Sequence, residues 1–153
     1  LLNLGPAKGK DFSTVLGPWL VTLDELQSLE IPCKENHTGV SWNLPMKCFV
    51  NGIQVSEGNL GDMDWTFAEI IERASYGVDL YPGDVIGSGT VGTGCFLELN
   101  GTGKLNDPDY TEQWLQAGDV VEMEIDGLGK LSNTIVAEET DWSILKLKKT
   151  PNL

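Results

Sequence analysis

A lysine on a constrained loop is the first residue of this sequence whose type and setting suit chemistry. Lys10 ends a stretch, residues 5–10, in which glycines and a proline prevent a helix. The apolar residues 19–22 follow and predict a strand, which Gly17-Pro18 separates from the loop. Lys10 is therefore predicted to present its ammonium group from a rigid loop just before a strand, although a solvated lysine is the commoner case.

Two further side chains have the chemistry of a binding or catalytic group. Thr90 follows Gly89 in a glycine-dense loop, where a hydroxyl can approach a ligand without obstruction by neighbouring side chains. The alternative is a turn threonine that bonds the local backbone. Glu98 interrupts an apolar run that predicts a strand. A carboxylate there is either one half of an acid–base pair or the outward residue of an alternating strand.

Two hairpins are predicted around turn residues. Residues 47–58 contain two short runs of strand-forming residues on either side of Asn51-Gly52, a pair suited to the positive φ angles of a type I′ turn. In the C-terminal third, residues 120–125 and 130–136 flank Gly127-Leu-Gly and predict the second hairpin. A short strand is also expected at residues 85–86.

One good helix is predicted, from about Thr66 to Ser75. Asp64 or Thr66 can cap it, its apolar residues fall on one face, and Gly77 ends it. The helix should pack on a sheet. Residues 28–45 are predicted to be a connector with a short strand near residues 40–42, and the last residues of the chain to be a strand and a tail.

Composition limits the partners and the compartment. A net charge of −13 over 153 residues repels phosphate backbones and anionic lipid, so neither nucleic acid nor a membrane is expected as a partner. The apolar runs are too short for a membrane span, and a soluble cytoplasmic protein with a single domain follows. The three cysteines lack CxxC spacing, so neither disulfides nor a zinc site is expected.

The order of these motifs resembles the C-terminal half of the fumarylacetoacetate hydrolase family. The resemblance runs from about Gly5 to Val136 and rests on five segments in order: Gly-Lys-Asp-Phe at 9–12, the Asn-Gly hairpin, Met-Asp-Trp-Thr-Phe-Ala-Glu at 63–69, Pro-Gly-Asp-Val-Ile-Gly-Ser-Gly-Thr at 82–90, and residues 115–133. It implies a mainly β (α+β) fold of the mixed β-sandwich roll type. Residues 1–153 would form part of a catalytic domain, usually found as a homodimer.

The resemblance also implies an activity. The family uses Mg²⁺ or Mn²⁺ and acts on a 2-oxo acid or a 1,3-diketo acid through a metal-stabilised enolate. Members hydrolyse C–C bonds of acylpyruvates or fumarylacetoacetate, or decarboxylate, hydrate, dehydrate or isomerise their substrates. Two alternatives are open: a non-catalytic, dimerising β domain that keeps the fold without the metal site, and a small-molecule binding module that uses the glycine loop.

Single residues acquire roles from the resemblance. Lys10 would be catalytic and stabilise the enolate, Thr90 would bind the substrate, and Glu98 would be a catalytic partner of a histidine. Thr14 matches a secondary cation contact, for which a hydrogen bond at the strand start is the preferred alternative. The family's metal ligands, a Glu-x-Glu pair and an aspartate, lie upstream of the lysine loop and have no counterpart in this chain. Lys10 and Thr90 are predicted to face a common cavity.

Several other polar residues are given structural interpretations. His37, the single histidine, is expected to be an exposed surface residue. Asp62 and Asp64 are expected at a helix start. Glu122 and Glu124 alternate along a strand and predict its solvated face. Cys95 has no recognisable histidine partner and is expected to be a small core residue.

Overall fold

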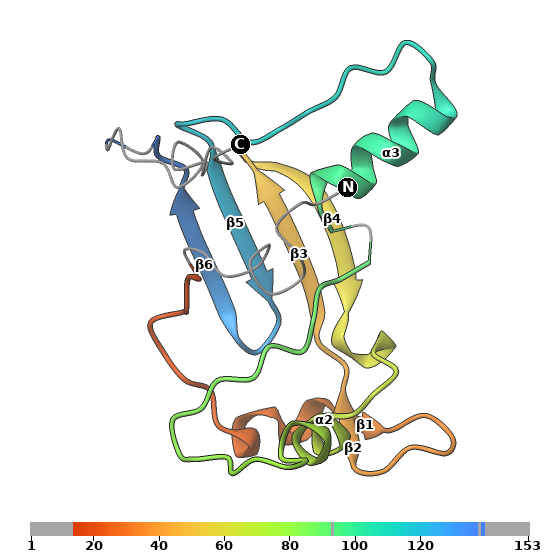
Figure 1. Ribbon diagram of the computed structural model, residues 1–153, viewed down its shortest axis with the longest axis vertical. Coiled ribbons are helices and arrows are strands. Elements are labelled where there is room, and N and C mark those ends of the chain that lie inside the picture. The colour runs from red at the N-terminus through yellow and green to blue at the C-terminus, as the bar shows by residue number, and fades with distance from the viewer. Residues whose placement is uncertain (1–13, 93, 138, 140–153) are drawn as a thin grey trace, which may run out of the picture.

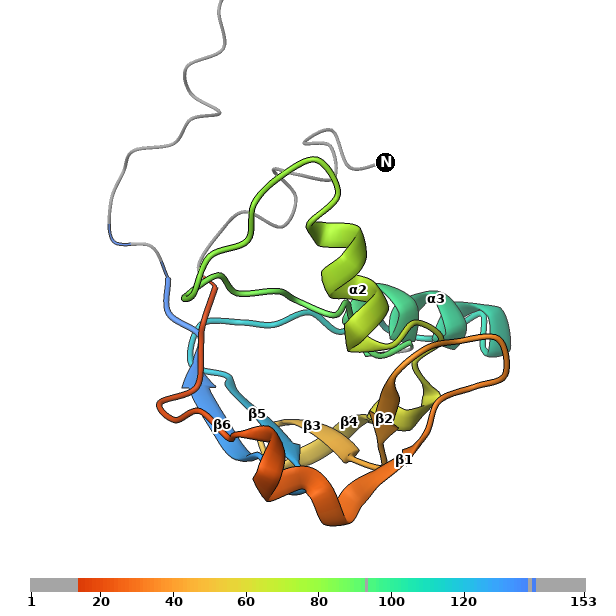
Figure 2. The same ribbon diagram turned by 90° about the horizontal axis from the view of Figure 1, so that it is seen from below.

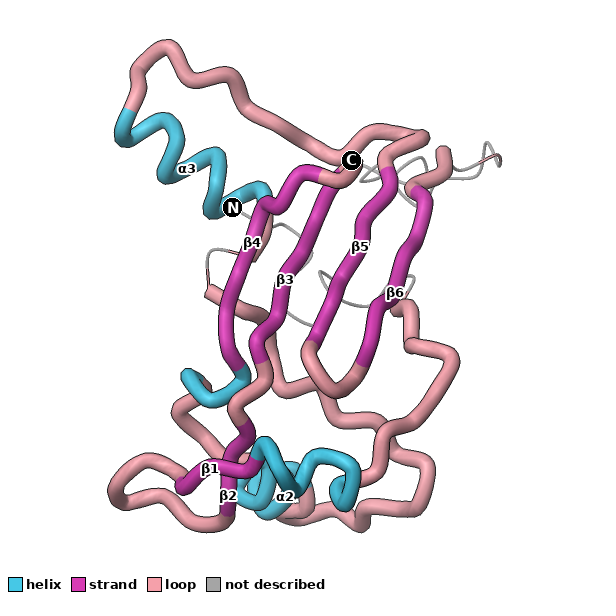
Figure 3. The backbone as a smooth tube through the Cα atoms, turned by 180° about the vertical axis from the view of Figure 1, so that it is seen from behind, coloured by secondary structure: helices cyan, strands magenta, loops and turns pink. Residues whose placement is uncertain are grey.

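The fold is mixed α+β with two antiparallel sheets, in agreement with the mainly β (α+β) class that the family resemblance implies. The computed structural model describes residues 14–92, 94–137 and 139. One sheet pairs two strands, and the other has four in the order β4-β3-β5-β6 (Figures 1 and 3). In chain order the described elements are η1 (Leu23–Leu29), β1 (Glu30–Pro32), β2 (Val40–Trp42), β3 (Pro45–Val50), β4 (Ile53–Asn59), η2 (Leu60–Asp62), α2 (Phe67–Ala74), α3 (Phe96–Asn106), β5 (Val120–Ile125) and β6 (Gly129–Thr134).

Both predicted hairpins are confirmed. Asn51 and Gly52 have φ angles of 51° and 78°, so both residues of the β3–β4 turn are in the left-handed region that a type I′ turn requires. The β5–β6 turn uses Gly127, with a φ of 80°. Each hairpin thus follows from local turn chemistry that is visible in the sequence.

Asn51 also joins the two hairpins. Its backbone N–H donates to the Val120 carbonyl, and its side-chain Oδ1 accepts from the Val120 N–H, each at 2.9 Å. Its Nδ2 donates to Asp119 Oδ1 at 2.8 Å. This bond and the backbone N–H of Gln116 lower the pKa of Asp119. The three contacts fix the register in which β3 meets β5, with Val50 opposite Val121.

The core lies at one end of the four-stranded sheet. Leu26, Trp42 and Leu44 are the buried apolar residues of the described chain, and Leu44 is 1% exposed. They lie where η1, the two-stranded sheet and α2 meet (Figures 1 and 2). The Phe67 ring of α2 is 6.2 Å from the Trp42 ring, centroid to centroid. The amphipathic helix predicted from Thr66 to Ser75 is therefore confirmed and packs its Phe67 against this core.

Two predicted strands are not present. Residues 19–22 lie in no strand, and Leu20 is 89% exposed. The Trp19 indole instead donates to the Leu128 carbonyl at 3.0 Å, so this segment meets the β5–β6 turn through a side chain rather than through a backbone ladder. Residues 85–86 belong to a loop. Both runs have strand-forming composition, but a strand also needs a partner, and neither finds one among the described residues.

The third correction concerns residues 96–99, predicted as a strand and found at the start of α3. Residues 95–117, the α3 excursion, leave the sheet and return to β5 (Figure 1). Asn100 is 3% exposed and binds the Gln113 backbone through both side-chain atoms, at 2.8 and 2.9 Å. The Tyr110 ring packs on Gly103, where a Cβ atom would approach to 2.5 Å. These contacts hold α3 against the chain that follows it. Several residues of α3, among them leucine, glutamate and lysine, also have a high helix propensity.

Candidate functional site

A cavity of about 460 Å³ lies between the glycine-rich loop and the sheet. Its floor includes a row of residues in register across three strands: Gly58 of β4 lies opposite Met46 of β3, and Met46 lies opposite Ile125 of β5. Residues in register share a face of the sheet. The loop contributes residues 88–92, and the remaining lining residues come from the end of β4 and from the turn that follows: Glu57, Asn59, Leu60, Asp62 and Met63.

Thr90 lies on the wall of this cavity with its hydroxyl available. The residue is exposed, and its hydroxyl makes no hydrogen bond to any described residue. Gly89 before it has a φ of 98°, which a residue with a side chain rarely adopts, so the backbone turn at this point depends on glycine. The local hydrogen bond that a structural turn threonine would make is therefore missing within the described chain.

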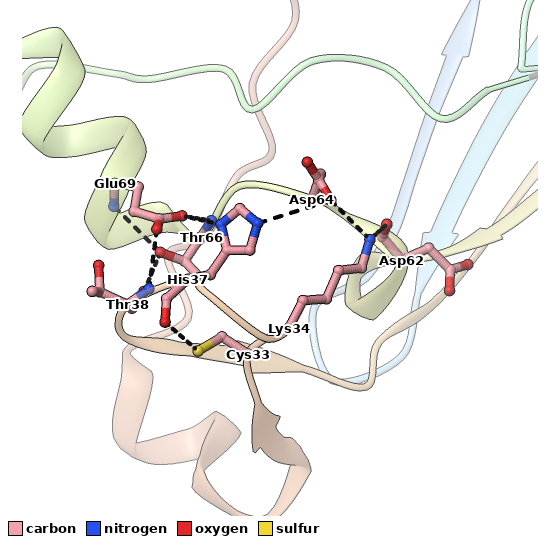
Figure 4. Close-up of polar contacts among 8 residues, drawn as sticks. All are labelled: Cys33, Lys34, His37, Thr38, Asp62, Asp64, Thr66 and Glu69. Carbon is pink, nitrogen blue, oxygen red and sulfur yellow. Dashed lines mark hydrogen bonds and ion pairs between the residues drawn. The ribbon is translucent and has the colours of Figure 1, made fainter.

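Two polar side chains on the opposite wall, Asn59 and Glu57, already make hydrogen bonds. Asn59 Nδ2 donates to Asn43 Oδ1 at 2.7 Å, and Asn59 Oδ1 accepts from the Gly61 N–H and begins η2. Gln54 Nε2 donates to Glu57 Oε2 at 2.9 Å. Figure 4 shows the Asp62 carboxylate pointing away from Lys34, whose ammonium donates to the Asp62 carbonyl. Among the lining side chains of the described chain, the hydroxyls of Thr90 and of Ser88 on the same loop make no hydrogen bond to a described residue, and Thr90 is the one that the sequence predicted for the site.

Next to the cavity, six residues form a polar clasp between the β1–β2 connection and the start of α2 (Figure 4). We call Lys34, His37, Thr38, Asp64, Thr66 and Glu69 the clasp. Glu69 accepts from His37 Nδ1 at 2.9 Å, from the Thr38 N–H at 3.0 Å and from the Thr66 N–H at 2.9 Å. Thr66 Oγ1 in turn donates to the Thr38 carbonyl at 2.6 Å.

These contacts lower the pKa of Glu69 to about 2. The largest cause is the Thr66 backbone N–H, followed by the His37 ring and by the Thr38 N–H. Because an ionised carboxylate only accepts, His37 Nδ1 carries the proton of that bond. The other ring nitrogen, Nε2, is 4.0 Å from Asp64 Oδ1, which also accepts from Lys34 at 3.4 Å.

The expectation that His37 is a surface residue is wrong. Its side chain is 14% exposed, and its ring lies edge-on to Trp65 with the centroids 5.3 Å apart. The sequence did show part of the clasp, since Thr66 and Glu69 have capping-box spacing and both capping bonds are present. It gave no signal for His37, which is 32 residues from Glu69.

A larger cavity of about 880 Å³ lies beside α2, on the other side of the clasp. Its walls include the Trp65 and Tyr76 rings and Ile70, with Glu69 and Arg73 at its polar side. None of the residues predicted for the site lines it. The candidate site is therefore the smaller cavity, because Thr90 lies there.

Of the other residues predicted for the site, Glu98 and Thr14 do not line this cavity. Lys10 lies outside the described residues, so its convergence with Thr90 stays a prediction. Glu98 is exposed on α3 and its Oε2 lies 3.5 Å from Cys95 Sγ, away from the cavity lining. Thr14 is exposed in a segment without secondary structure. Cys95 is exposed rather than part of the core, and all three cysteines are free.

The described residues do not fit a metal ion. No group of three or more His, Cys, Asp or Glu side chains that could hold one occurs among them. The cavity has two carboxylates on its wall, Glu57 and Asp62, whereas Mg²⁺ requires near-octahedral oxygen ligands. Glu122 is also unsuitable, since it is half-buried and pairs with Lys130 at 2.6 Å, which raises the pKa of Lys130. The interpretation of Glu122 as simply solvated is thus corrected.

Comparison with known proteins decides the family. Residues 2–136 match the family described as fumarylacetoacetate (FAA) hydrolase C-terminal. The chain belongs to the fumarylacetoacetate hydrolase family. Within this family, it is 31% identical over 147 residues to the fumarylacetoacetase of Oryza sativa and 38% identical over 130 residues to the mitochondrial oxaloacetate tautomerase fahd2 of Xenopus laevis. These alignments cover 78% and 84% of this chain.

The chain spans about a third of the length of these fumarylacetoacetate hydrolase relatives, 34% in both cases. A solved HpcE-like protein of Mycobacterium smegmatis has the same fold, with a TM-score of 0.56 and 27% identity over 79% of this chain and 36% of that one. Among the described helices, none combines the length and the apolar character of a membrane span.

Proposed function

We propose that this chain is part of an enzyme that acts on a 2-oxo acid or a 1,3-diketo acid. The reaction is hydrolysis of a C–C bond, as in acylpyruvates and fumarylacetoacetate, or decarboxylation, and it passes through an enolate. The observation that carries the proposal is the Thr90 hydroxyl, which lies on a cavity wall without a hydrogen-bond partner among the described residues. Relatives named fumarylacetoacetase and oxaloacetate tautomerase support the substrate class.

Each residue has a separate task in this proposal. Thr90 donates its hydroxyl proton in a hydrogen bond to the carboxylate or keto oxygen of the substrate and so orients it. The Lys10 ammonium stabilises the negative charge that develops on the enolate oxygen. Glu98 Oε2 has the Cys95 thiol as its described partner, and its proposed partner is a histidine from outside this chain, since the chain's single histidine, His37, binds Glu69.

A divalent metal ion is part of the proposal. Mg²⁺ or Mn²⁺, as the family chemistry implies, would take its ligands from the segment upstream of the lysine loop, and the described residues do not form such a site. The roles of Thr90 and Lys10 are therefore stated as binding and charge stabilisation by the protein itself. We further propose a cytoplasmic homodimer, which light scattering and cell fractionation can test.

Thr90 gives the sharpest test of function. Thr90→Val keeps the shape of the side chain and removes the hydroxyl, whereas Thr90→Ser keeps the hydroxyl and removes a methyl group. With an acylpyruvate and with oxaloacetate as substrates, Thr90→Val should lower kcat/KM roughly ten- to hundredfold, as expected for a lost hydrogen bond to a charged group. Thr90→Ser should stay within about threefold of the unaltered protein.

Two results would oppose the proposal. Equal kcat/KM for Thr90→Val and the unaltered protein would remove Thr90 from substrate binding. A full-length protein without turnover of either substrate, in the presence of Mg²⁺ or Mn²⁺, would favour the non-catalytic, dimerising β domain.

A further inference from the structure

The loop that carries Thr90 contacts β4 where Val91 packs on Gly58. The position of a Cβ atom on Gly58 would lie 2.6 Å from Cγ1 of Val91 and 3.5 Å from its Cγ2. Carbon atoms in good contact are about 3.5–4.0 Å apart. The methyl groups of Val91 therefore occupy the space that any side chain at position 58 would need.

The backbone conformation at position 58 does not require a glycine. Gly58 is absent from the glycines with positive φ, and it is an interior residue of β4. A glycine inside a strand weakens that strand, and it commonly marks the close approach of another segment. The close approach at Gly58 is the docking of Val91, the residue directly after Thr90.

A second close approach of a glycine, that of Gly94 to Ser56, lies along the same strand. Gly94 donates its N–H to the Val91 carbonyl at 3.2 Å, and a Cβ atom at Gly94 would lie 2.8 Å from that carbonyl and 3.4 Å from Ser56 Oγ. Ser56 is two residues before Gly58 and therefore on the same face of β4. Both ends of the 91–94 turn thus approach one face of the strand, while the loop before Thr90 is largely exposed.

We infer that Gly58 is a positioning residue for Thr90: the space left by its missing side chain holds Val91 and sets the height of the Thr90 loop above the sheet. This inference rests on the proposed function of Thr90. An alanine at position 58 must move Val91 by about 1 Å to reach normal contact. Val91 is stiff at χ1, so much of that movement passes to the loop backbone. A displacement of this size near a reacting group can cost about a hundredfold in rate.

The test is a double-mutant cycle in the full-length protein with the same two substrates. Gly58→Ala should lower kcat/KM roughly ten- to hundredfold. In a Val91→Ala background, which removes the clashing methyl groups, Gly58→Ala should cost less than about threefold. In a Thr90→Val background, Gly58→Ala should likewise add little, because its effect acts through the hydroxyl that is already missing. A general loss of structure would not show this second dependence.

A crystal structure of Gly58→Ala separates this inference from the proposed function. If Thr90→Val has no effect, the role of Thr90 fails and with it the positioning role, whatever the loop does. If Thr90→Val is impaired and Gly58→Ala keeps both the loop position and full kcat/KM, the positioning inference alone is wrong. Should Gly58→Ala not fold, Val91→Leu enlarges the other partner of the contact and should displace the loop in the same way, and an unmoved loop there would overturn the inference.

Discussion

Two regions of the molecule, the core with the clasp beside it and the loop that carries Thr90, are held in different ways. On one side, the buried Leu44 and the clasp around Glu69 join η1, the two-stranded sheet and α2 through apolar burial and several side-chain hydrogen bonds. On the other, the loop before Thr90 is largely exposed. Its described internal bonds are few, including those between Tyr81 and Asp84. It touches the sheet through Val91 on Gly58.

The difference separates stability from function. Substitutions at the clasp and core should change the free energy of unfolding with modest effects on substrate binding. Substitutions in the glycine loop should change turnover with little effect on unfolding, because regions with few buried contacts contribute little to global stability. The experiments below can break this division or refine it.

The largest effect is expected in the core. Leu44→Ala removes a side chain that is 1% exposed and should lower the free energy of unfolding by about 2–5 kcal/mol. Val85→Ala is the matched control in the loop, since Val85 is 71% exposed and its loss should cost less than about 0.5 kcal/mol. Urea unfolding measures both. Equal losses would show that the loop contributes to stability as much as the core does.

The next effect belongs to Lys10, which lies outside the described residues. Lys10→Met should lower kcat roughly a hundredfold or more and change KM far less, because the ammonium faces little charge in the ketone and a full charge in the enolate. Lys8→Met, two residues earlier, is the control and should remain active. Steady-state kinetics with an acylpyruvate and oxaloacetate decide the matter. Near-normal turnover of Lys10→Met would exclude this lysine from the mechanism.

A smaller effect should appear at acid pH. The pKa of Glu69 is lowered from 4.5 to about 2 in the folded protein, so its contribution to stability is complete above pH 4.5 and is lost as the pH falls from 4.5 towards 2. Glu69→Gln should therefore be less stable than the unaltered protein at pH 7, and the two should converge in this window.

Glu72→Gln provides the control for this experiment. Glu72 lies on the same helix and is exposed, and its carboxylate makes no hydrogen bond or ion pair with the described residues. Because Glu72→Gln breaks no described contact, it should differ little in stability from the unaltered protein at pH 7. Other carboxyl groups with lowered pKa values, Glu112 and Asp119, are present in all three proteins and cancel in the difference. Parallel stability curves for Glu69→Gln and the unaltered protein would contradict the clasp.

The smallest expected signal is from metal binding to this chain by itself. Residues 1–153 should show no tight Mg²⁺ binding in calorimetry, because the described residues lack a sufficient set of oxygen ligands. A site of micromolar affinity or better would contradict this expectation and would place metal ligands inside the chain.

The sequence predicted those features that depend on neighbouring residues. The type I′ turn at Asn51-Gly52 and the cap at Thr66 are local chemistry, and both are confirmed. The helix at residues 96–106 was missed because the short apolar run suits a strand or a helix equally, and the contact of Asn100 with Gln113 lies further along the chain. The composition of residues 96–99 alone cannot decide between a strand and a helix when the deciding contact, Asn100 with Gln113, lies outside that run.

The site shows the same limit. The sequence singled out Thr90, which lines a cavity, but the side chains that surround it were not predicted. The partner of His37 is 32 residues away, and Val91 meets Gly58 from a distant loop. Such pairs form only when the whole sheet is assembled, and neither residue type signals its partner. Whether Lys10 reaches the same cavity is still a prediction.

The bonds of Asn51 to Val120 and Asp119 bear on where residues can be inserted into this chain without loss of the fold. They close a loop of the chain that holds α2, the glycine loop and the α3 excursion, between two hairpins that each form locally. The entropy cost of closing a flexible loop grows only with the logarithm of its length, by about 0.6 kcal/mol for each doubling. Residues can thus be added to the α3 excursion at little cost, while the strand pairing that supports the Thr90 cavity keeps its register.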